Sequence, residues 1–150
     1  MKKQYLVLLI LVWVSSLGLA ACGGSQGDEQ PSVGASDTRE TEPPEEYAGI
    51  TNPYSGDSAA VEAGGSIYQT NCVPCHGEQG GGDGPAAAAL NPRPQDIAGR
   101  EDDLSDGYLY WRIAEGGQMA PFNSAMPAWK SILSDEQIWH VISYLRTLDE

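Results

Sequence analysis

The chain contains the stretch Cys72-Val73-Pro74-Cys75-His76. We expect the residues around it to fold round the group that this stretch binds. Two thiols three positions apart can each form a thioether with one vinyl group of a haem, and an adjacent histidine then lies under the iron as an axial ligand. The spacing therefore predicts one covalent haem c, attached through Cys72 and Cys75, with His76 as an iron ligand.

Three other interpretations of this stretch stay open at this point. A structural zinc site needs four ligands, and the chain offers only Cys72, Cys75, His76 and His140, two of which are neighbours in sequence. A thioredoxin-type dithiol needs a surrounding βαβ pattern, which the sequence does not show. A disulfide between Cys72 and Cys75 would close a tight, strained ring.

Three more segments accompany the motif. They are Gly64-Gly65-Ser66-Ile67-Tyr68 before it, Met126-Pro127-Ala128-Trp129 after it, and an apolar helical pattern over residues 139–148. With these segments the chain resembles a class I c-type cytochrome over about residues 57–149. The resemblance implies an all-α domain wrapped round one haem, with crossing N-terminal and C-terminal helices, and an electron-transfer protein in place of an enzyme.

The second iron ligand should come from the loop after residue 116, which contains two methionines. Met126 fits the family pattern, and Pro127 stiffens the backbone where the sulfur must be held. Met119 is the rival, and we expect it otherwise to line the edge of the pocket. His140 lies opposite the apolar stripe of its helix, which disfavours ligation by two histidines.

The resemblance also implies roles for residues around the haem. The Pro85 carbonyl should accept the Nδ1 proton of His76, which would orient the ring. Arg93 should pair with a haem propionate, with a solvated side chain as the alternative. Trp129 is expected among the surroundings of the haem.

The helix boundaries follow from caps and periodicity. The first helix should begin near Asp57 or Ser58 and present Gly64 and Gly65 to a closely crossing helix. A middle helix is predicted over residues 103–114, ending at a pair of glycines. Ser134 and Gln137 form a capping box that should open the last helix, whose apolar stripe crosses the glycines.

The N-terminus has the pattern of a bacterial lipoprotein signal. Lys2 and Lys3 precede an uncharged apolar run that ends in Leu19-Ala20-Ala21-Cys22. We expect residues 1–21 to be removed and Cys22 to be lipidated; an uncleaved transmembrane anchor is the alternative. Both place the domain at the cell membrane, on its extracytoplasmic (periplasmic) side.

Residues 22–56 are rich in Gly, Ser, Pro and acidic side chains, so they should form a disordered tether before a domain at 57–150. The segment from Tyr47 to Ser55 carries two Tyr, an Ile and a Pro, and packing of this segment against the domain is the alternative to a free tether. The formal net charge of the 150 residues is −13. Loss of Lys2 and Lys3 leaves 6 basic against 21 acidic side chains, a charge of −15. Such a surface disfavours nucleic acid and favours redox partners that are basic where they dock; the alternative is that the charge only keeps an exported protein soluble.

The resulting hypothesis is a membrane-tethered one-electron shuttle between respiratory or photosynthetic complexes. A fixed haem c subunit of a larger membrane oxidoreductase is the second hypothesis. A small peroxidase or gas sensor, in which Met126 dissociates, is the third.

Overall fold

The computed structural model describes residues 41–98, 100 and 103–148. The predicted signal segment 1–21, the predicted lipidation site Cys22 and the tether up to residue 40 lie outside these residues. The described elements, in chain order, are α1 (Ser58–Asn71), α2 (Val73–His76), η2 (Ala87–Ala89), α3 (Asp106–Glu115), η3 (Trp129–Ser131) and α4 (Asp135–Leu145). No strand occurs among them, which agrees with the predicted all-α fold. None of these described helices combines the length and the apolar character that a bilayer crossing requires.

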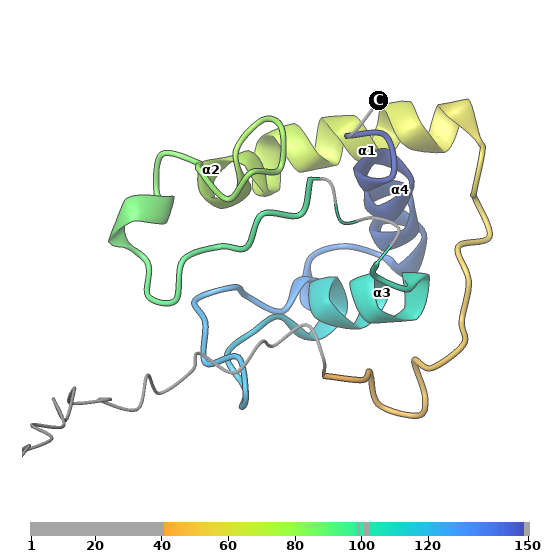
Figure 1. The fold of residues 1–150 in the computed structure, drawn as a ribbon. Helices are drawn as coiled ribbons and strands as arrows, with labels where there is room; N and C mark the ends of the chain where they lie inside the picture. The colour runs from red at the N-terminus through yellow and green to blue at the C-terminus, as the bar shows by residue number, and fades with distance from the viewer. Residues whose placement is uncertain (1–40, 99, 101–102, 149–150) are drawn as a thin grey trace, which may run out of the picture. The chain divides into compact units, whose positions relative to one another are not determined.

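Helix α1 begins where its cap predicts and crosses α4 at its glycines (Figure 1). The Asp57 side chain accepts hydrogen bonds from the backbone N–H groups of Ala59 and Ala60, at 2.8 and 3.4 Å. A Cβ atom on Gly64 would lie 1.9 Å from the carbonyl oxygen of His140, so only glycine allows this crossing. The predicted contact between the first and the last helix is confirmed.

Helix α4 opens with the predicted capping box and buries an apolar stripe. The Ser134 hydroxyl accepts from the backbone N–H of Gln137, and the Gln137 side chain accepts from the backbone N–H of Ser134. The side chains of Ile138 and Ile142 are fully buried. This stripe forms the main core together with Tyr68 of α1 and with one face of α3.

Helix α3 uses two apolar faces. Leu109 and Ile113 join the main core, while Tyr108 and Trp111 form a second cluster with Phe122. The helix begins later than predicted, because the Ser105 hydroxyl caps it by accepting from the backbone N–H of Tyr108 at 3.1 Å. It ends at Gly116, where φ is +72°.

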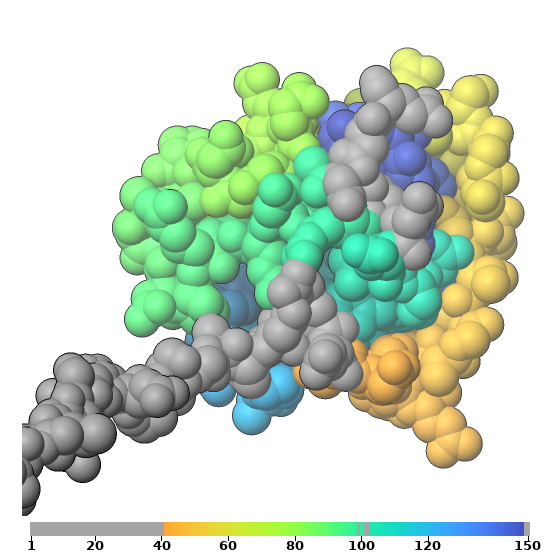
Figure 2. Space-filling view, in the orientation of Figure 1, coloured from red at the N-terminus to blue at the C-terminus, as the bar shows by residue number. Residues whose placement is uncertain are grey.

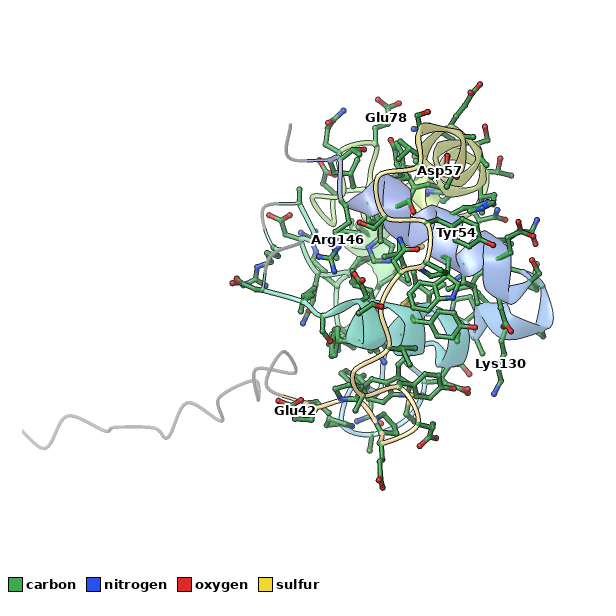
Figure 3. All side chains as sticks on the ribbon, turned by 90° about the vertical axis from the view of Figure 1, so that its right-hand side faces the viewer. Glu42, Tyr54, Asp57, Glu78, Lys130 and Arg146 are labelled. Atoms are coloured by element: carbon green, nitrogen blue, oxygen red, sulfur yellow. The ribbon has the colours of Figure 1, made fainter. Side chains whose placement is uncertain are left out.

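Residues 44–57, which we call the strap, lie against α3 and α4 (Figure 3). The Asn52 side chain is buried and donates to the hydroxyl of Ser143 on α4 at 2.8 Å, and its backbone N–H donates to Asp106 on α3 at 2.7 Å. The Tyr47 hydroxyl donates to Glu115 at 2.7 Å. Of the two possibilities left open for residues 47–55, a free tether and a segment that lies against the domain, the structure shows the second, because polar and aromatic side chains of the strap find partners on two helices.

Candidate haem site

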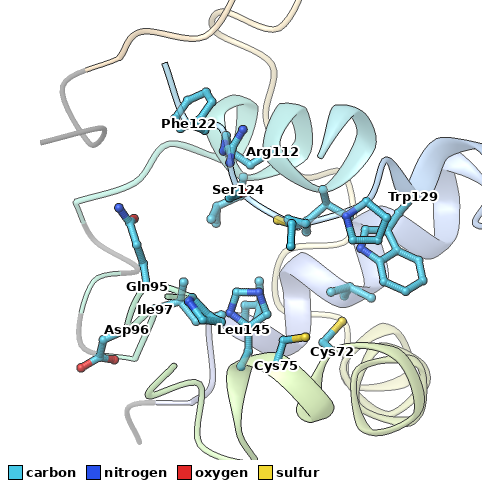
Figure 4. Close-up of a pocket in the computed structure, with 18 of the residues that line it drawn as sticks. Cys72, Cys75, Gln95, Asp96, Ile97, Arg112, Phe122, Ser124, Trp129 and Leu145 are labelled. Carbon is cyan, nitrogen blue, oxygen red and sulfur yellow. The ribbon is translucent and has the colours of Figure 1, made fainter. Parts of the chain in front are cut away.

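A cavity of about 810 Å³ lies between the end of α1, α3, α4 and the loop before η3 (Figure 4). That volume falls within the range of about 300–1,000 Å³ that is typical of small-molecule and cofactor sites. Residues from the loop after η2 also line the cavity, and in the space-filling view this part of the chain lies beside α3 (Figure 2). Of the residues predicted from the sequence, the cavity is lined by Cys72, Cys75, His76, Arg93, Met126 and Trp129.

The first wall of the cavity, which we call the Cys/His wall, carries Cys72, Cys75 and His76. These residues sit at the end of α1 and on the single turn of α2. The following Gly-rich loop holds this turn in place through backbone hydrogen bonds, since Gly82, Gly84 and Ala86 donate to the carbonyls of His76, Cys75 and Pro74 at 2.8, 3.2 and 2.8 Å.

The two thiols are unbonded, and the first is held in its protonated form. Burial, with a smaller contribution from Cys75, raises the pKa of the Cys72 thiol to about 12. A thiol that stays protonated is a poor metal ligand and a poor redox nucleophile. Within the described part of the chain, no group of three or more His, Cys, Asp or Glu side chains is placed to hold a metal ion. The zinc and dithiol interpretations therefore have no support in the geometry.

His76 offers a neutral imidazole to the cavity. Burial lowers its pKa, while a hydrogen bond with the backbone of Gln95 has a smaller, opposite effect. The Nδ1 atom is buried and has no hydrogen-bond partner. A neutral ring with a free buried nitrogen is suited to bind a metal, so the donor set of this wall fits a haem iron.

The predicted hydrogen bond from His76 to the Pro85 carbonyl is wrong in this structure, because Nδ1 has no partner. Pro85 is also not among the residues that line the cavity. The ring makes its hydrogen bond with the backbone of Gln95 instead, while the flanking Gly84 and Ala86 donate to backbone carbonyls of the Cys motif. The segment is thereby docked on the main chain of the turn, and not on its histidine side chain.

The opposite wall, which we call the Met wall, is the loop 116–129. It is closed by two backbone hydrogen bonds: Gly117 donates to the Met126 carbonyl at 2.9 Å, and Ser124 donates to the Gly117 carbonyl at 2.7 Å. A Cβ atom on Gly116 would lie 2.5 Å from the backbone of Pro127, so this glycine lets α3 end directly against the Met-Pro segment. The loop thus brings Met126 to the cavity.

Met119 does not line this cavity, so the expectation that it lies at the pocket edge is wrong. Its side chain packs against the second cluster, with Tyr108, Trp111 and Phe122. His140 lies outside the cavity as well, with its ring edge-on to Tyr54 at a centroid distance of 4.7 Å.

Positive charge gathers at the cavity in an otherwise acidic protein. Three arginines line it, Arg93, Arg100 and Arg112, against one acidic residue, Asp96. Sequence reasoning selected only the exposed Arg93 and missed the other two. The available signal was the scarcity of basic residues, 8 against 21 acidic, because each base in such a chain needs an explanation.

Comparison with known proteins places this geometry in a family. Residues 59–145 match the family model described as cytochrome C oxidase, cbb3-type, subunit III. The chain is 30% identical over 150 residues to cytochrome c550 of Pseudomonas aeruginosa, covering 95% of this chain and 94% of that protein.

Two solved structures share the fold. Cytochrome CL from Methylophaga aminisulfidivorans superposes with a TM-score of 0.50 at 22% identity, over 66% of this chain and 59% of that one. A chain of the reducing HAO-like protein complex Kustc0457/Kustc0458 of Kuenenia stuttgartiensis does so with a TM-score of 0.51 at 27% identity, over 62% of this chain. Our chain spans only 45% of that second structure.

Members of this family bind a single covalent haem c and carry electrons without catalysing a further reaction. The helical fold, the cavity between the Cys/His wall and the Met wall, and both sequence matches all indicate this family. The chain belongs to the cytochrome c family, as a class I c-type cytochrome with one haem that transfers electrons.

Proposed function

We propose that Cys72 and Cys75 attach the haem by thioethers and that His76 and Met126 are its axial ligands. The observation that carries this proposal is that one cavity brings together all four side chains, with the Cys/His wall and the Met wall facing across it. The haem supplies one-electron redox chemistry when bound.

The residues of the two walls make this site a carrier. His76 is kept neutral by burial, so its lone pair is available to iron. A thioether sulfur is a soft ligand that raises the reduction potential relative to a second imidazole. With a ligand from each wall no coordination position is left open, and this disfavours the peroxidase and gas-sensor alternatives.

An optical spectrum of the oxidised holoprotein tests the ligand assignment. Met ligation gives a weak sulfur-to-iron charge-transfer band, which should be lost in Met126→Ala and kept in the matched variant Met119→Ala. Loss of the band only in Met119→Ala would contradict the assignment. Protein that is colourless after expression with a cytochrome maturation system, with both thiols still open to alkylation, would contradict haem attachment itself.

We propose further that the mature chain begins at a lipidated Cys22 and is thereby tethered to the extracytoplasmic side of the cell membrane. The charge-free apolar run and the Leu-Ala-Ala-Cys ending support this. Mass spectrometry of the purified protein should find a diacylated N-terminal Cys22. An intact N-terminus that starts at Met1 would instead support an uncleaved anchor.

The tethered domain then acts as a shuttle between a donor and an acceptor in the membrane. The formal charge of −13 supports partners with a basic docking patch. Transfer rates measured by stopped flow should fall as ionic strength rises, because salt screens the attraction. Electron-transfer rates that do not change with ionic strength would contradict electrostatic docking.

A fixed subunit of a larger oxidoreductase is the second candidate, and the matched family model favours it because its description names an oxidase subunit. Mild detergent extraction separates the two candidates. A shuttle should elute alone in size-exclusion chromatography, whereas a subunit should elute with other membrane proteins in fixed stoichiometry.

A further inference from the structure

Glu115 and Lys130 form an ion pair that joins the two ends of the Met wall. Glu115 is the last residue of α3 and directly precedes the loop 116–129. Lys130 directly follows Trp129, where that loop ends and η3 begins. The Lys130 Nζ atom lies 2.6 Å from Oε1 and 2.7 Å from Oε2 of Glu115. This pair, which we call the clasp, therefore closes the loop on its outer side.

A hydroxyl from a distant part of the chain binds the clasp. The Tyr47 hydroxyl of the strap donates to Oε1 of Glu115 at 2.7 Å, so this oxygen accepts from both Tyr47 and Lys130. The hydrogen bond to Glu115 is the main reason that the pKa of Tyr47 rises to about 12, and the hydroxyl therefore keeps its proton at neutral pH. A hydrogen bond to an ionised carboxylate is stronger than a neutral one, so it orients the Glu115 side chain.

The strap holds Tyr47 in place through contacts with two helices. The Tyr47 carbonyl lies against Gly107 in the first turn of α3, where a Cβ atom would collide with it, so only glycine allows this approach. Further along the strap, the buried Asn52 donates to Asp106 of α3 and to Ser143 of α4. Because these contacts already fix the strap, the Tyr47 hydroxyl binds the clasp with little further loss of conformational entropy.

The clasp lies next to the part of the Met wall that faces the cavity. Trp129, the neighbour of Lys130, lines the cavity, and so does Met126. With the clasp closed, the loop is held at both ends, which restricts the positions that the Met126 sulfur can take. With the clasp open, Lys130 and Trp129 could move away from α3, and the segment with Met126 would follow them.

We propose that Tyr47 is a positioning residue for Met126, because it holds Glu115 toward Lys130 and so keeps the Met wall closed. This rests on the proposed assignment of Met126 as an iron ligand. An element that precedes the Cys motif in the sequence thereby controls the ligand that follows it. The consequence is a methionine that a competing ligand displaces less easily.

The affinity of the ferric holoprotein for free imidazole, which competes with Met126, tests this proposal. Tyr47→Phe removes one hydroxyl and keeps both the ring and the net charge. Imidazole should bind about threefold more tightly to this variant, because the partly exposed clasp then exchanges its contacts with water. Lys130→Met removes the clasp itself and should raise the affinity by a similar factor, about threefold.

The double variant Tyr47→Phe/Lys130→Met shows whether the hydroxyl acts through the clasp. If it does, the double variant should also bind imidazole about threefold more tightly, whereas two independent effects would multiply to about ninefold. Tyr54→Phe is the matched control, since it removes a hydroxyl from the same strap where that hydroxyl interacts with Glu136 of α4 (Figure 3). It should leave the imidazole affinity unchanged.

Unchanged imidazole affinity in Tyr47→Phe, an equal increase in Tyr54→Phe, or multiplied effects in the double variant would each overturn the proposal. A merely structural role of Tyr47 would lower the guanidinium midpoint of the helical signal and leave the imidazole affinity at the wild-type value. If Lys130→Met does not fold, Lys130→Gln takes its place. Failure of the ligand assignment is distinguishable, because Met126→Ala would then bind imidazole as the wild type does.

Discussion

The two walls of the haem cavity are built in different ways. The Cys/His wall lies at the end of a fourteen-residue helix and on one following turn, so its three functional residues are neighbours in sequence. The Met wall is a loop, and its position depends on backbone contacts at Gly116 and Gly117 and on side chains from α3. The residues of the Cys/His wall are held by neighbours in the sequence, whereas the Met wall is held by contacts with other segments of the chain.

This difference predicts which wall of the haem cavity opens first. The Cys/His wall shares the α1–α4 crossing with the main core, so it should be lost only when the whole domain unfolds. The Met wall has no helix of its own before η3 and packs mainly on the small second cluster through Phe122 and Met119, and loop segments of this kind open at lower free energy than the core. Ligand exchange should therefore begin at Met126 and not at His76.

The largest effect is expected where the first wall joins the core. In Gly64→Ala the new Cβ meets the His140 carbonyl at 1.9 Å, and two backbones must separate. We expect the free energy of unfolding to fall by about 3 kcal/mol, the upper end of the usual cost of overpacking, since a contact between two backbones cannot relax by a side-chain shift. Both walls should fail together in guanidinium titrations followed by far-UV circular dichroism and by the charge-transfer band.

Gly65→Ala is the control for this variant. Its Cβ would meet only the Tyr144 ring, at 3.0 Å, and a side chain can shift. The gain in helix propensity of about 1 kcal/mol offsets that shift, so stability should stay close to wild type. Equal losses in the two variants would show that the crossing has no special role.

A smaller loss of stability is expected when the Met wall is strained at Gly116, where it joins α3. Gly116→Ala puts a Cβ at φ +72° and 2.5 Å from the Pro127 backbone. Strain of this kind costs about 1–3 kcal/mol, and it should fall on the loop. The charge-transfer band should disappear at a lower denaturant concentration than the helical signal, which would separate the two walls.

Gly49→Ala controls for backbone strain alone. This strap residue has φ +75°, but no atom lies within 4 Å of the place that a Cβ would take there. The band and the helical signal should then shift together and only slightly. A separation of the two signals in Gly49→Ala would mean that positive φ, and not the contact with Pro127, decides the result.

The smallest effect concerns the ion pair on the outside of the Met wall, between Glu115 and Lys130 at 2.6 Å. Hydrogen bonds from Lys130 and then from Tyr47 lower the pKa of Glu115. Because the folded state holds the lower pKa, the stabilisation is full above the ordinary value of about 4.3 and is lost as pH falls through the folded value. Glu115→Gln should thus cost about 0.5–1 kcal/mol at pH 7 and less at about pH 3, where the carboxylate is being protonated.

Thermal unfolding of both proteins at the two pH values measures this difference. Glu62→Gln, on the exposed side of α1, is the matched control and should show no such pH-dependent difference. A Glu115→Gln difference that persists unchanged in acid would show that the carboxylate charge is not its source.

The sequence predicted those features that depend on short segments of the chain. The Cys-X-X-Cys-His spacing, the caps at Asp57 and Ser134 and the glycines of the crossing depend on neighbours in the chain. Family resemblance then chose Met126, the methionine that the structure brings to the cavity, over Met119.

It failed where the partner lies far along the chain. Asn52 looks like part of a polar linker until its contacts with Ser143 and Asp106 are known. Arg112 looks like the solvated side of a helix until the cavity on that side is known. Pro85 was assigned a contact by family pattern, and in the structure the His76 ring bonds the backbone of Gln95 instead.

The crossing at Gly64 also sets an order of events during biogenesis. Because α4 is the last helix of the described chain, the segment that leads into the Cys motif has no helix to pack on until synthesis has passed residue 145. Until α4 docks, α1 lacks its main packing partner, so the folding of the segment that presents the two thiols depends on the far end of the domain.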